Sequence, residues 1–280
     1  AYTPLFLAVL NMNLPAVELL LQRGANPNCG CASSSMGHQR SPLDLACTWH
    51  HHAADGDDAR PVAIAIARSL LENGADVNLP GASSHGTPLH NAIDTPELVQ
   101  LLLQFSADVN AGCNDVLGPP LHTAVAGKRQ MRNNSKHNVE STVLLLSNGA
   151  DPDAISRRGE CALSIAASMG DCELLSVLVS HGADVNGPAQ RREEPRILRP
   201  GDDPAQTPLE TSLRFPGATC FLLSCGADPH EMYWWKQLLM PGVVGNHVKE
   251  STPFMSSRRN KRSIMLLLMQ APIVFDDVRL

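Results

Sequence analysis

A short polar phrase recurs along this chain, each time after an apolar segment with helical spacing. The phrase opens with Gly or Ser, continues with Ala and then Asp or Asn, and ends two residues later on Asn, Asp or His. Its six copies are Gly24–Asn28, Gly74–Asn78, Ser106–Asn110, Gly149–Asp153, Gly182–Asn186 and Gly226–His230. Repeats with a period of roughly 20 to 50 residues are typical of solenoids, in which each unit buries its apolar face against the next. The chain is therefore predicted to fold as a stack of helix pairs.

A second motif, Thr-Pro-Leu or a close variant, stands a helix pair before most of these phrases. In Thr87-Pro88-Leu89, Thr can cap the first helix and Pro can occupy its first turn, where no backbone donor is needed. The Gly that opens the phrase stands where a helix ends in a left-handed residue. Because Ser106 replaces this Gly in the third copy, we expect a strained or reshaped helix end there.

Together, these motifs resemble the ankyrin repeat family, whose unit of about 33 residues has a turn and two antiparallel helices. The resemblance runs from Thr3 to about His230, with a fainter copy after Ser251. It implies an all-α ankyrin-repeat solenoid of about seven helix-turn-helix repeats with loop fingers and several insertions, forming a single domain over 1–280. The expected repeats lie at about 1–30, 37–80, 81–112, 113–155, 156–187 and 202–231, with a degenerate one at 250–274. Because Ala1 already falls inside a repeat, we also expect the chain to be excised from a longer protein.

The composition argues against some classes of partner and compartment. The 280 residues carry a net charge of −6, which provides no general attraction to nucleic acid or to anionic membranes. No apolar run approaches the roughly 20 residues that a membrane-spanning helix needs, and residues 1–9 lack the features of a secretory signal. The eight cysteines follow no disulfide framework, which favours reduced thiols in a cytoplasmic or nuclear protein. We expect no nucleic-acid partner and no membrane insertion, and the oligomeric state stays open.

The family resemblance also indicates where a partner would bind. In ankyrin proteins the exposed contact positions flank the Gly that stands before Thr-Pro-Leu or follow the two small residues of the first helix, and they line a concave surface. Carried over by register, those positions are Tyr2, Leu10, Asn11, Arg40, Thr48, Trp49, His85, Asp94, Leu117, Ala126, Arg158, Glu160, Ser168 and Met169. Trp49 and Arg158 are of the residue types that most often dominate interfaces. The set suits an extended peptide or a helix that carries apolar and acidic groups.

Two groups of candidate metal ligands have spacings that argue against a site. The first group consists of three consecutive histidines and nearby carboxylates, His50–His52, Asp55, Asp57 and Asp58. Adjacent residues rarely converge on one ion, although imidazole and carboxylate are good ligands. The second group, which lacks the fixed spacing of a tetrahedral zinc site, is Cys29, Cys31, His38 and Cys47. Polar loops are the preferred interpretation of both groups, so we expect no metal and no cofactor.

Three basic clusters and one aromatic pair have two interpretations each. The clusters lie at 128–137, 191–199 and 258–262, and solvated surface charge is the preferred interpretation. If the partner is acidic, the first two clusters are where it would bind. The pair Trp234 and Trp235 is either a hot spot for a partner or, as we prefer, a packing group at a departure from the repeat.

No catalytic motif is found: the chain lacks Gly-x-Ser-x-Gly, a phosphate-binding glycine loop and His-Glu-x-x-His. The resemblance assigns His90 and His122 a structural role, in which the imidazole bonds the backbone of a neighbouring loop. We therefore expect a non-catalytic module that binds a peptide segment or partner protein on its concave face. It would act as a substrate-recruiting adaptor, for example of a ubiquitin ligase, or as a scaffold. Two alternatives stay open: a structural or self-assembly domain that packs within its own parent protein, and accessory repeats of an enzyme whose catalytic domain lies elsewhere.

Overall fold

The fold is known from a computed structural model, which describes residues 2–29, 31–32, 39–48, 59–81, 86–112, 118–127, 139–156, 159–187 and 207–229. These residues belong to two compact units, Ala1–Ala162 and Leu163–Leu280. The expected seventh repeat, the three basic clusters and the tryptophan pair lie outside the described residues.

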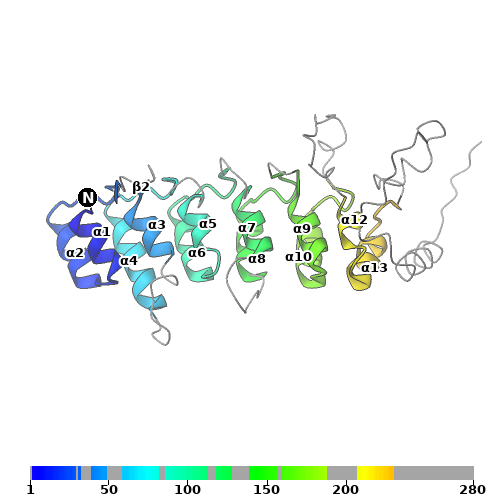
Figure 1. Ribbon diagram of the computed structural model, residues 1–280, viewed down its shortest axis with the longest axis horizontal. Coiled ribbons are helices and arrows are strands. Elements are labelled where there is room, and N and C mark those ends of the chain that lie inside the picture. The colour runs from blue at the N-terminus through cyan, green and yellow to red at the C-terminus, as the bar shows by residue number, and fades with distance from the viewer. Residues whose placement is uncertain are drawn as a thin grey trace, which may run out of the picture. The chain divides into compact units, whose positions relative to one another are not determined.

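The described part of the first unit consists of stacked helix pairs (Figure 1). Its helices are α1 Pro4–Leu10, α2 Leu14–Gln22, α3 Pro42–Cys47, α4 Arg60–Glu72, α5 Pro88–Ala92, α6 Pro96–Gln104, α7 Pro120–Ala126 and α8 Val139–Ser147. The odd-numbered helices contact one another in chain order and form one row, and the even-numbered helices form a second row against them. This arrangement, in which each pair packs on the next, confirms the predicted ankyrin-type stack.

The second unit follows the same plan. Its helices among the described residues are α9 Ala162–Met169, which begins at the last residue of the first unit, α10 Cys172–Ser180, α12 Pro208–Ser212 and α13 Pro216–Ser224. Helix α13 packs on both α12 and α10. Phe215, directly before α13, lies so close to Gly170 that a side chain at Gly170 would overlap its ring. Glycine is therefore required at the turn between α9 and α10.

Two short strands depart from the helical pattern. They are β1 Cys31–Ala32 and β2 Gln39–Arg40, which pair antiparallel with Cys31 opposite Arg40. Both lie between α2 and α3, in a loop finger at the junction of the first two expected repeats. Extended segments that run back on each other satisfy their backbone groups by pairing. The all-α prediction is therefore confirmed for the stacked helix pairs, and this finger adds a small hairpin to them.

Local sequence explains where the helices begin and end. Thr3 and Ser41 cap α1 and α3, and their side chains accept the backbone N–H of Phe6 at 3.2 Å and of Asp44 at 3.0 Å. A proline follows each cap in the first turn. Ser106 ends α6 with φ 65°, the left-handed conformation that glycine adopts in the other copies. The expected strain at this helix end is confirmed, since left-handed backbone costs an L-residue about 1–2 kcal/mol.

A row of side-chain amides ties the repeated phrases that close on Asn to the phrase that follows. The Asn that closes a phrase accepts, through Oδ1, the backbone N–H of the Asp in the following phrase. In the first unit these bonds join Asn28 to Asp76 at 2.7 Å, Asn78 to Asp108 at 2.8 Å and Asn110 to Asp151 at 2.9 Å. In the second unit Asn186 accepts from Asp228 at 2.7 Å. This row, the asparagine ladder, satisfies backbone donors that the turns cannot pair internally.

Two buried histidines connect neighbouring helix pairs as well. Nδ1 of His90 accepts the Thr87 backbone N–H at 3.1 Å, so Nε2 carries the proton and donates to the Gly118 carbonyl at 3.1 Å. Nε2 of His122 lies 2.9 Å from the Glu160 carbonyl. Burial lowers the pKa of His90 to about 4, although the Gly118 bond opposes this shift, and the nearby His122 adds to it. The structural role expected for both imidazoles is confirmed.

The low pKa of His90 predicts that acid destabilises the stack. An unfolded histidine titrates near pH 6.5, so between pH 6.5 and about 4 the unfolded state binds a proton that the folded state excludes. Acidification from pH 7 to pH 5 should therefore remove about 2 kcal/mol of the unfolding free energy through His90. Urea melts of wild-type and His90→Gln protein at both pH values should show their stability difference shrinking by this amount. A difference that does not change with pH contradicts the prediction.

Leu102 in α6 tests whether the even-numbered row is packed as described. Its side chain is completely buried, so Leu102→Ala should lower the unfolding free energy by about 2–5 kcal/mol. Gln104→Ala, at an exposed position of the same helix, is the matched control and should change it by less than about 0.5 kcal/mol. Thermal and urea melts measure both variants. A melting temperature that moves by less than about one degree for Leu102→Ala would be inconsistent with a core position.

Candidate functional site

The structure places the expected contact residues in different environments. The exposed ones are Tyr2, Asn11, Asp94 and Glu160. The half-buried ones are Leu10, Arg40, Ala126, Ser168 and Met169. Thr48 is buried, and Trp49, His85, Leu117 and Arg158 lie outside the described residues. The exposed and half-buried members in the first unit form what we name the contact set: Tyr2, Leu10, Asn11, Arg40, Asp94, Ala126 and Glu160.

The contact set occupies the ends of the odd-numbered row. Tyr2 and Arg40 each come directly before the residue that caps the next helix, and Glu160 takes the equivalent place before α9. Leu10 and Ala126 are the last residues of α1 and α7. The backbone at these places is fixed by the caps and, at Glu160, by the bond from His122 to its carbonyl. Side chains of different kinds are thus held on a constant framework.

Tyr2 is the large aromatic member of the contact set. Its ring stacks on Phe6 with centroids 5.5 Å apart and an angle of 25° between the rings. Phe6 is buried, whereas Tyr2 is 60% exposed. The stack orients one face of the Tyr2 ring and leaves the rest to solvent, which gives a partner an apolar surface with a polar hydroxyl.

The expectation that Thr48 is exposed is wrong. Thr48 is only 1% exposed, and its hydroxyl lies 3.1 Å from the Leu45 carbonyl and 3.3 Å from the Asp44 carbonyl at the end of α3. The same oxygen accepts Nη2–H of Arg40 at 2.7 Å. The hydroxyl therefore has both a carbonyl acceptor at the end of α3 and a guanidinium donor, so it can be buried without an unpaired polar group. Thr48 therefore supports the contact set and does not belong to it.

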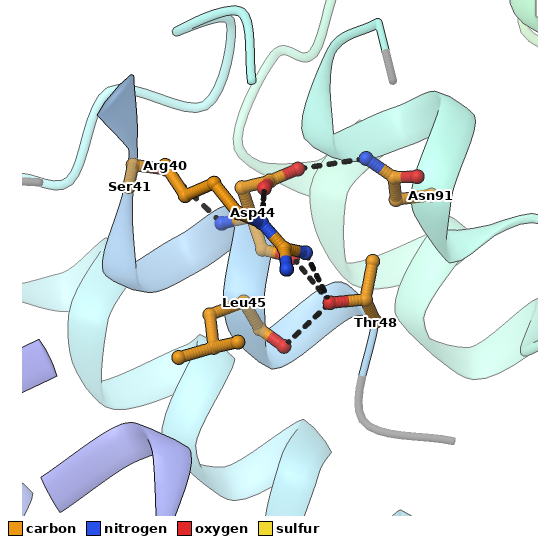
Figure 2. Close-up of polar contacts among 6 residues, drawn as sticks. All are labelled: Arg40, Ser41, Asp44, Leu45, Thr48 and Asn91. Carbon is orange, nitrogen blue, oxygen red and sulfur yellow. Dashed lines mark hydrogen bonds and ion pairs between the residues drawn. The ribbon is translucent and has the colours of Figure 1, made fainter. Parts of the chain in front are cut away.

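Arg40 is held by a polar network centred on a buried carboxylate (Figure 2). Nε of Arg40 lies 2.9 Å from Oδ2 of Asp44, whose side chain is fully buried, while that of Arg40 is 28% exposed. The other carboxylate oxygen accepts Nδ2–H of Asn91, from α5, at 2.7 Å. Each carboxylate oxygen thus has a donor, as burial of an ion requires. The network fixes the guanidinium in one orientation at the edge of the surface.

The roles of Asp44 and Asn91 were not predicted from the sequence, although the motif position of Asp44 is a signal for them. Asp44 stands in Ser41-Pro42-Leu43-Asp44 at the place that His90 and His122 take in their own copies. A carboxylate cannot donate to the next loop as those imidazoles do. Instead, the carbonyl of Gly86, equivalent in place to Gly118, accepts the Gly81 N–H at 2.8 Å. A Cβ at Gly81 would lie 2.8 Å from Oδ1 of Asp44, so only glycine fits beside this carboxylate.

The candidate metal ligands that the structure describes are not gathered into a site. Cys29 is exposed and Cys47 is buried. Burial, and then the nearby Asp44 carboxylate, raise the pKa of the Cys47 thiol, so it stays protonated and packs as a small apolar group. In the described stretches no three His, Cys, Asp or Glu residues converge on one point. The histidine and aspartate group at 50–58 and His38 lie outside those stretches.

No helix in the parts of the chain that the structure covers is long and apolar enough to cross a bilayer. The contact set offers an aromatic ring, exposed carboxylates and a half-exposed guanidinium, which are groups for non-covalent recognition of another surface.

Removing Arg40 should expose the cost of burying Asp44. Arg40→Ala leaves a buried carboxylate with Asn91 but without its cation, and we expect a loss of about 2–4 kcal/mol in unfolding free energy. Arg60→Ala, which breaks the exposed Arg60–Glu97 pair at 3.9 Å, is the matched control and should cost less than about 1 kcal/mol. Urea denaturation measures both. Equal effects of the two substitutions would show that the network adds no more than a surface ion pair.

Two family models match the chain, and both are described as ankyrin repeat. They match residues 2–31 and 158–187. The first segment contains α1 and α2, and the second contains α9 and α10.

Curated proteins and solved structures include similar chains. Ankyrin repeat and SOCS box protein 6 of Homo sapiens is 32% identical over 201 residues, which cover 65% of this chain and 35% of that protein. The protein of the same name from Pongo abelii gives the same figures. The chain thus spans about a third of the length of the curated relatives it matches. The crystal structure of the human ASB11 ankyrin repeat domain is similar with a TM-score of 0.57 and 25% identity, over 81% of this chain and 85% of that one.

Ankyrin repeats are generally non-catalytic modules for protein–protein interaction. The family models, the similar domain and the stacked helix pairs agree with one another. This chain is an ankyrin-repeat protein.

Proposed function

We propose that this chain is the partner-recognition part of an adaptor and binds a peptide segment of another protein along the contact set. The observation that carries the proposal is the contrast between constant and variable positions. The helix pairs share buried Leu and Ala positions, whereas the place before the first helix varies: it holds Tyr2, Arg40 and Glu160 in three copies and Gly86 and Gly118 in two others. Where this position is not glycine, side chains of different kinds stand there and are available for selecting a partner.

The charges in the contact set favour a selective interface. Arg40 is paired with Asp44, so its charge is largely compensated, while Asp94 and Glu160 present carboxylates at the surface. Charged groups at an interface contribute mainly to specificity and association rate, and an aromatic anchor such as Tyr2 contributes contact area. A partner segment with an apolar residue near Tyr2 and donors near the carboxylates would complement these residues.

The relatives support the adaptor role over a passive spacer. Their names, ankyrin repeat and SOCS box protein, state that an ankyrin part is joined to a second module in one polypeptide. A recognition domain joined to another module is the arrangement that a substrate-recruiting adaptor, for example of a ubiquitin ligase, requires. In that role the present chain would select the substrate.

Quantitative affinity capture with the natural full-length protein tests this role. Tyr2→Ala combined with Glu160→Ala should reduce the amount of captured partner at least tenfold, as loss of interface anchors commonly does. The matched control is Gln100→Ala combined with Gln104→Ala, two exposed residues of α6 in the even-numbered row, which should leave capture unchanged. Equal capture by both double variants would remove the contact set as the binding surface. For the adaptor role itself, ubiquitination of the captured partner should fall when the contact-set variant replaces the wild type.

A further inference from the structure

Arg40 is held in place at both its backbone and its guanidinium. Its backbone lies in β2, where Arg40 stands opposite Cys31 of β1, and the next residue, Ser41, caps α3. At the far end of the side chain, Nε donates to Oδ2 of Asp44 at 2.9 Å and Nη2 donates to Oγ1 of Thr48 at 2.7 Å (Figure 2). The guanidinium therefore has one preferred orientation and loses little freedom when a ligand binds to it.

The groups that hold the guanidinium are themselves buried and bonded. The side chains of Asp44 and Thr48 are buried. The second carboxylate oxygen of Asp44 accepts from the Asn91 amide at 2.7 Å, and the Thr48 hydroxyl lies 3.1 Å from the Leu45 carbonyl of α3. Neither Asp44 nor Thr48 can turn outward to meet a ligand, so a ligand at this place meets the guanidinium.

Part of the guanidinium is open. A guanidinium has N–H donors on Nε, Nη1 and Nη2, and Asp44 and Thr48 accept from Nε and Nη2 only. In the part of the chain that the structure describes, Nη1 has no acceptor and is not among the buried polar atoms that lack one. The Arg40 side chain is 28% exposed, whereas that of Asp44 is not exposed at all. Arg40 thus presents fixed donors to a partner while its counter-ion stays out of reach.

An open guanidinium selects among acceptors by charge and by shape. A carboxylate accepts in charge-assisted hydrogen bonds, which are roughly twice as strong as those of a neutral carbonyl, and its two oxygens can span neighbouring nitrogens. A phosphate group would bring more negative charge to a contact set that already exposes Asp94 and Glu160. We propose that Arg40 binds the side-chain carboxylate of an Asp or Glu residue of the partner, an inference that rests on the peptide interface proposed above. Asp44 is then a positioning residue, which acts through Arg40.

Asp44 weakens the attraction between Arg40 and an anion without removing it. Coulomb attraction falls with separation, and a carboxylate in contact with Nη1 is nearer to the guanidinium than to the buried Asp44. The pairing therefore reduces the long-range attraction of acidic chains in general and leaves a short-range preference at one place. Arg40 selects an acidic residue at a fixed position of the partner segment, and net negative charge of the segment is not enough.

Selection from a phage-displayed library of random peptides, with the natural full-length protein as bait, tests this inference. Wild-type protein should enrich peptides that carry Asp or Glu at one fixed position. In a synthetic copy of an enriched peptide, replacing that acid by its amide should weaken binding at least tenfold, because a charge-assisted pair becomes a neutral one. Enriched peptides without such an acid, or an amide replacement that leaves the affinity within about twofold, would overturn the inference. This measurement needs no protein variant.

Arg40→Lys tests whether the preference belongs to this side chain. Lysine keeps a cation beside Asp44, but its single ammonium lacks the planar set of donors that serves Asp44 and a partner together. In this variant the acid-to-amide replacement should weaken binding less than about threefold. Arg60→Lys, at an exposed arginine of α4, is the matched control and should keep the tenfold difference. An undiminished difference in the Arg40→Lys protein would place the acid elsewhere and overturn the inference.

Binding of the same peptides to Tyr2→Ala combined with Glu160→Ala separates this inference from the proposed function. Peptides that need Tyr2 and Glu160 but show no preference for an acid would overturn the inference and leave the proposed interface in place. Peptides that bind the double variant as tightly as the wild type would contradict the proposed interface, and the inference with it.

Discussion

The rest of the first unit depends on a hydrogen bond from the backbone N–H of one turn to the side-chain amide of the turn before it. Asn78 accepts from Asp108, and the same bond recurs one phrase later between Asn110 and Asp151. A short turn cannot pair all of its own backbone donors, and each of these exposed hydrogen bonds contributes about 0.5–1.5 kcal/mol. The asparagine ladder lets each turn complete its neighbour, so that turns and helices stack in one register.

In the first helix of a pair, the side chains of two adjacent residues point toward opposite neighbouring pairs. The third residue after a cap faces the following pair, as His90 does toward Gly118, and the fourth faces the preceding pair, as Asn91 does toward Asp44. Interactions of this kind link nearest neighbours, so stability is approximately a sum over adjacent pairs. A substitution at one of these residues therefore weakens one junction, and a pair at an end of the array has a face that must be covered or polar.

The sequence allowed the helix ends and the stack to be predicted because these depend on local chemistry and period. Thr3 caps α1, glycine or Ser106 ends the second helix of a pair in left-handed backbone, and the apolar spacing identifies Leu102 as core. The partner of a polar side chain in another pair is not local. Asp44 accepts from Asn91, which lies 47 residues away in sequence and in the next helix pair.

The candidate site was predictable only as a set of register positions for the same reason. Register shows that Tyr2, Arg40 and Glu160 come before caps, but the exposed area of each depends on neighbours that the period does not specify. Tyr2 is oriented by Phe6 and Arg40 by Asp44. The sequence shows Asp44 at the motif position that is histidine in the copies of His90 and His122. The effect of this replacement on Gly81 and Gly86 is visible only in the structure.

Arg40 differs from the other contact residues because it serves the fold and the surface together. Tyr2 and Glu160 can change without leaving a buried ion behind, so partner selection can vary at those places at little cost in stability. At Arg40 the buried Asp44 carboxylate needs the guanidinium, which restricts substitution even when a partner would favour another side chain. The same restriction means that Arg40 loses little side-chain entropy on binding, since its orientation is already fixed. In the proposed interface, a contact made by Arg40 would therefore be the least variable and the most pre-organised part, and specificity would be adjusted around it at Tyr2 and Glu160.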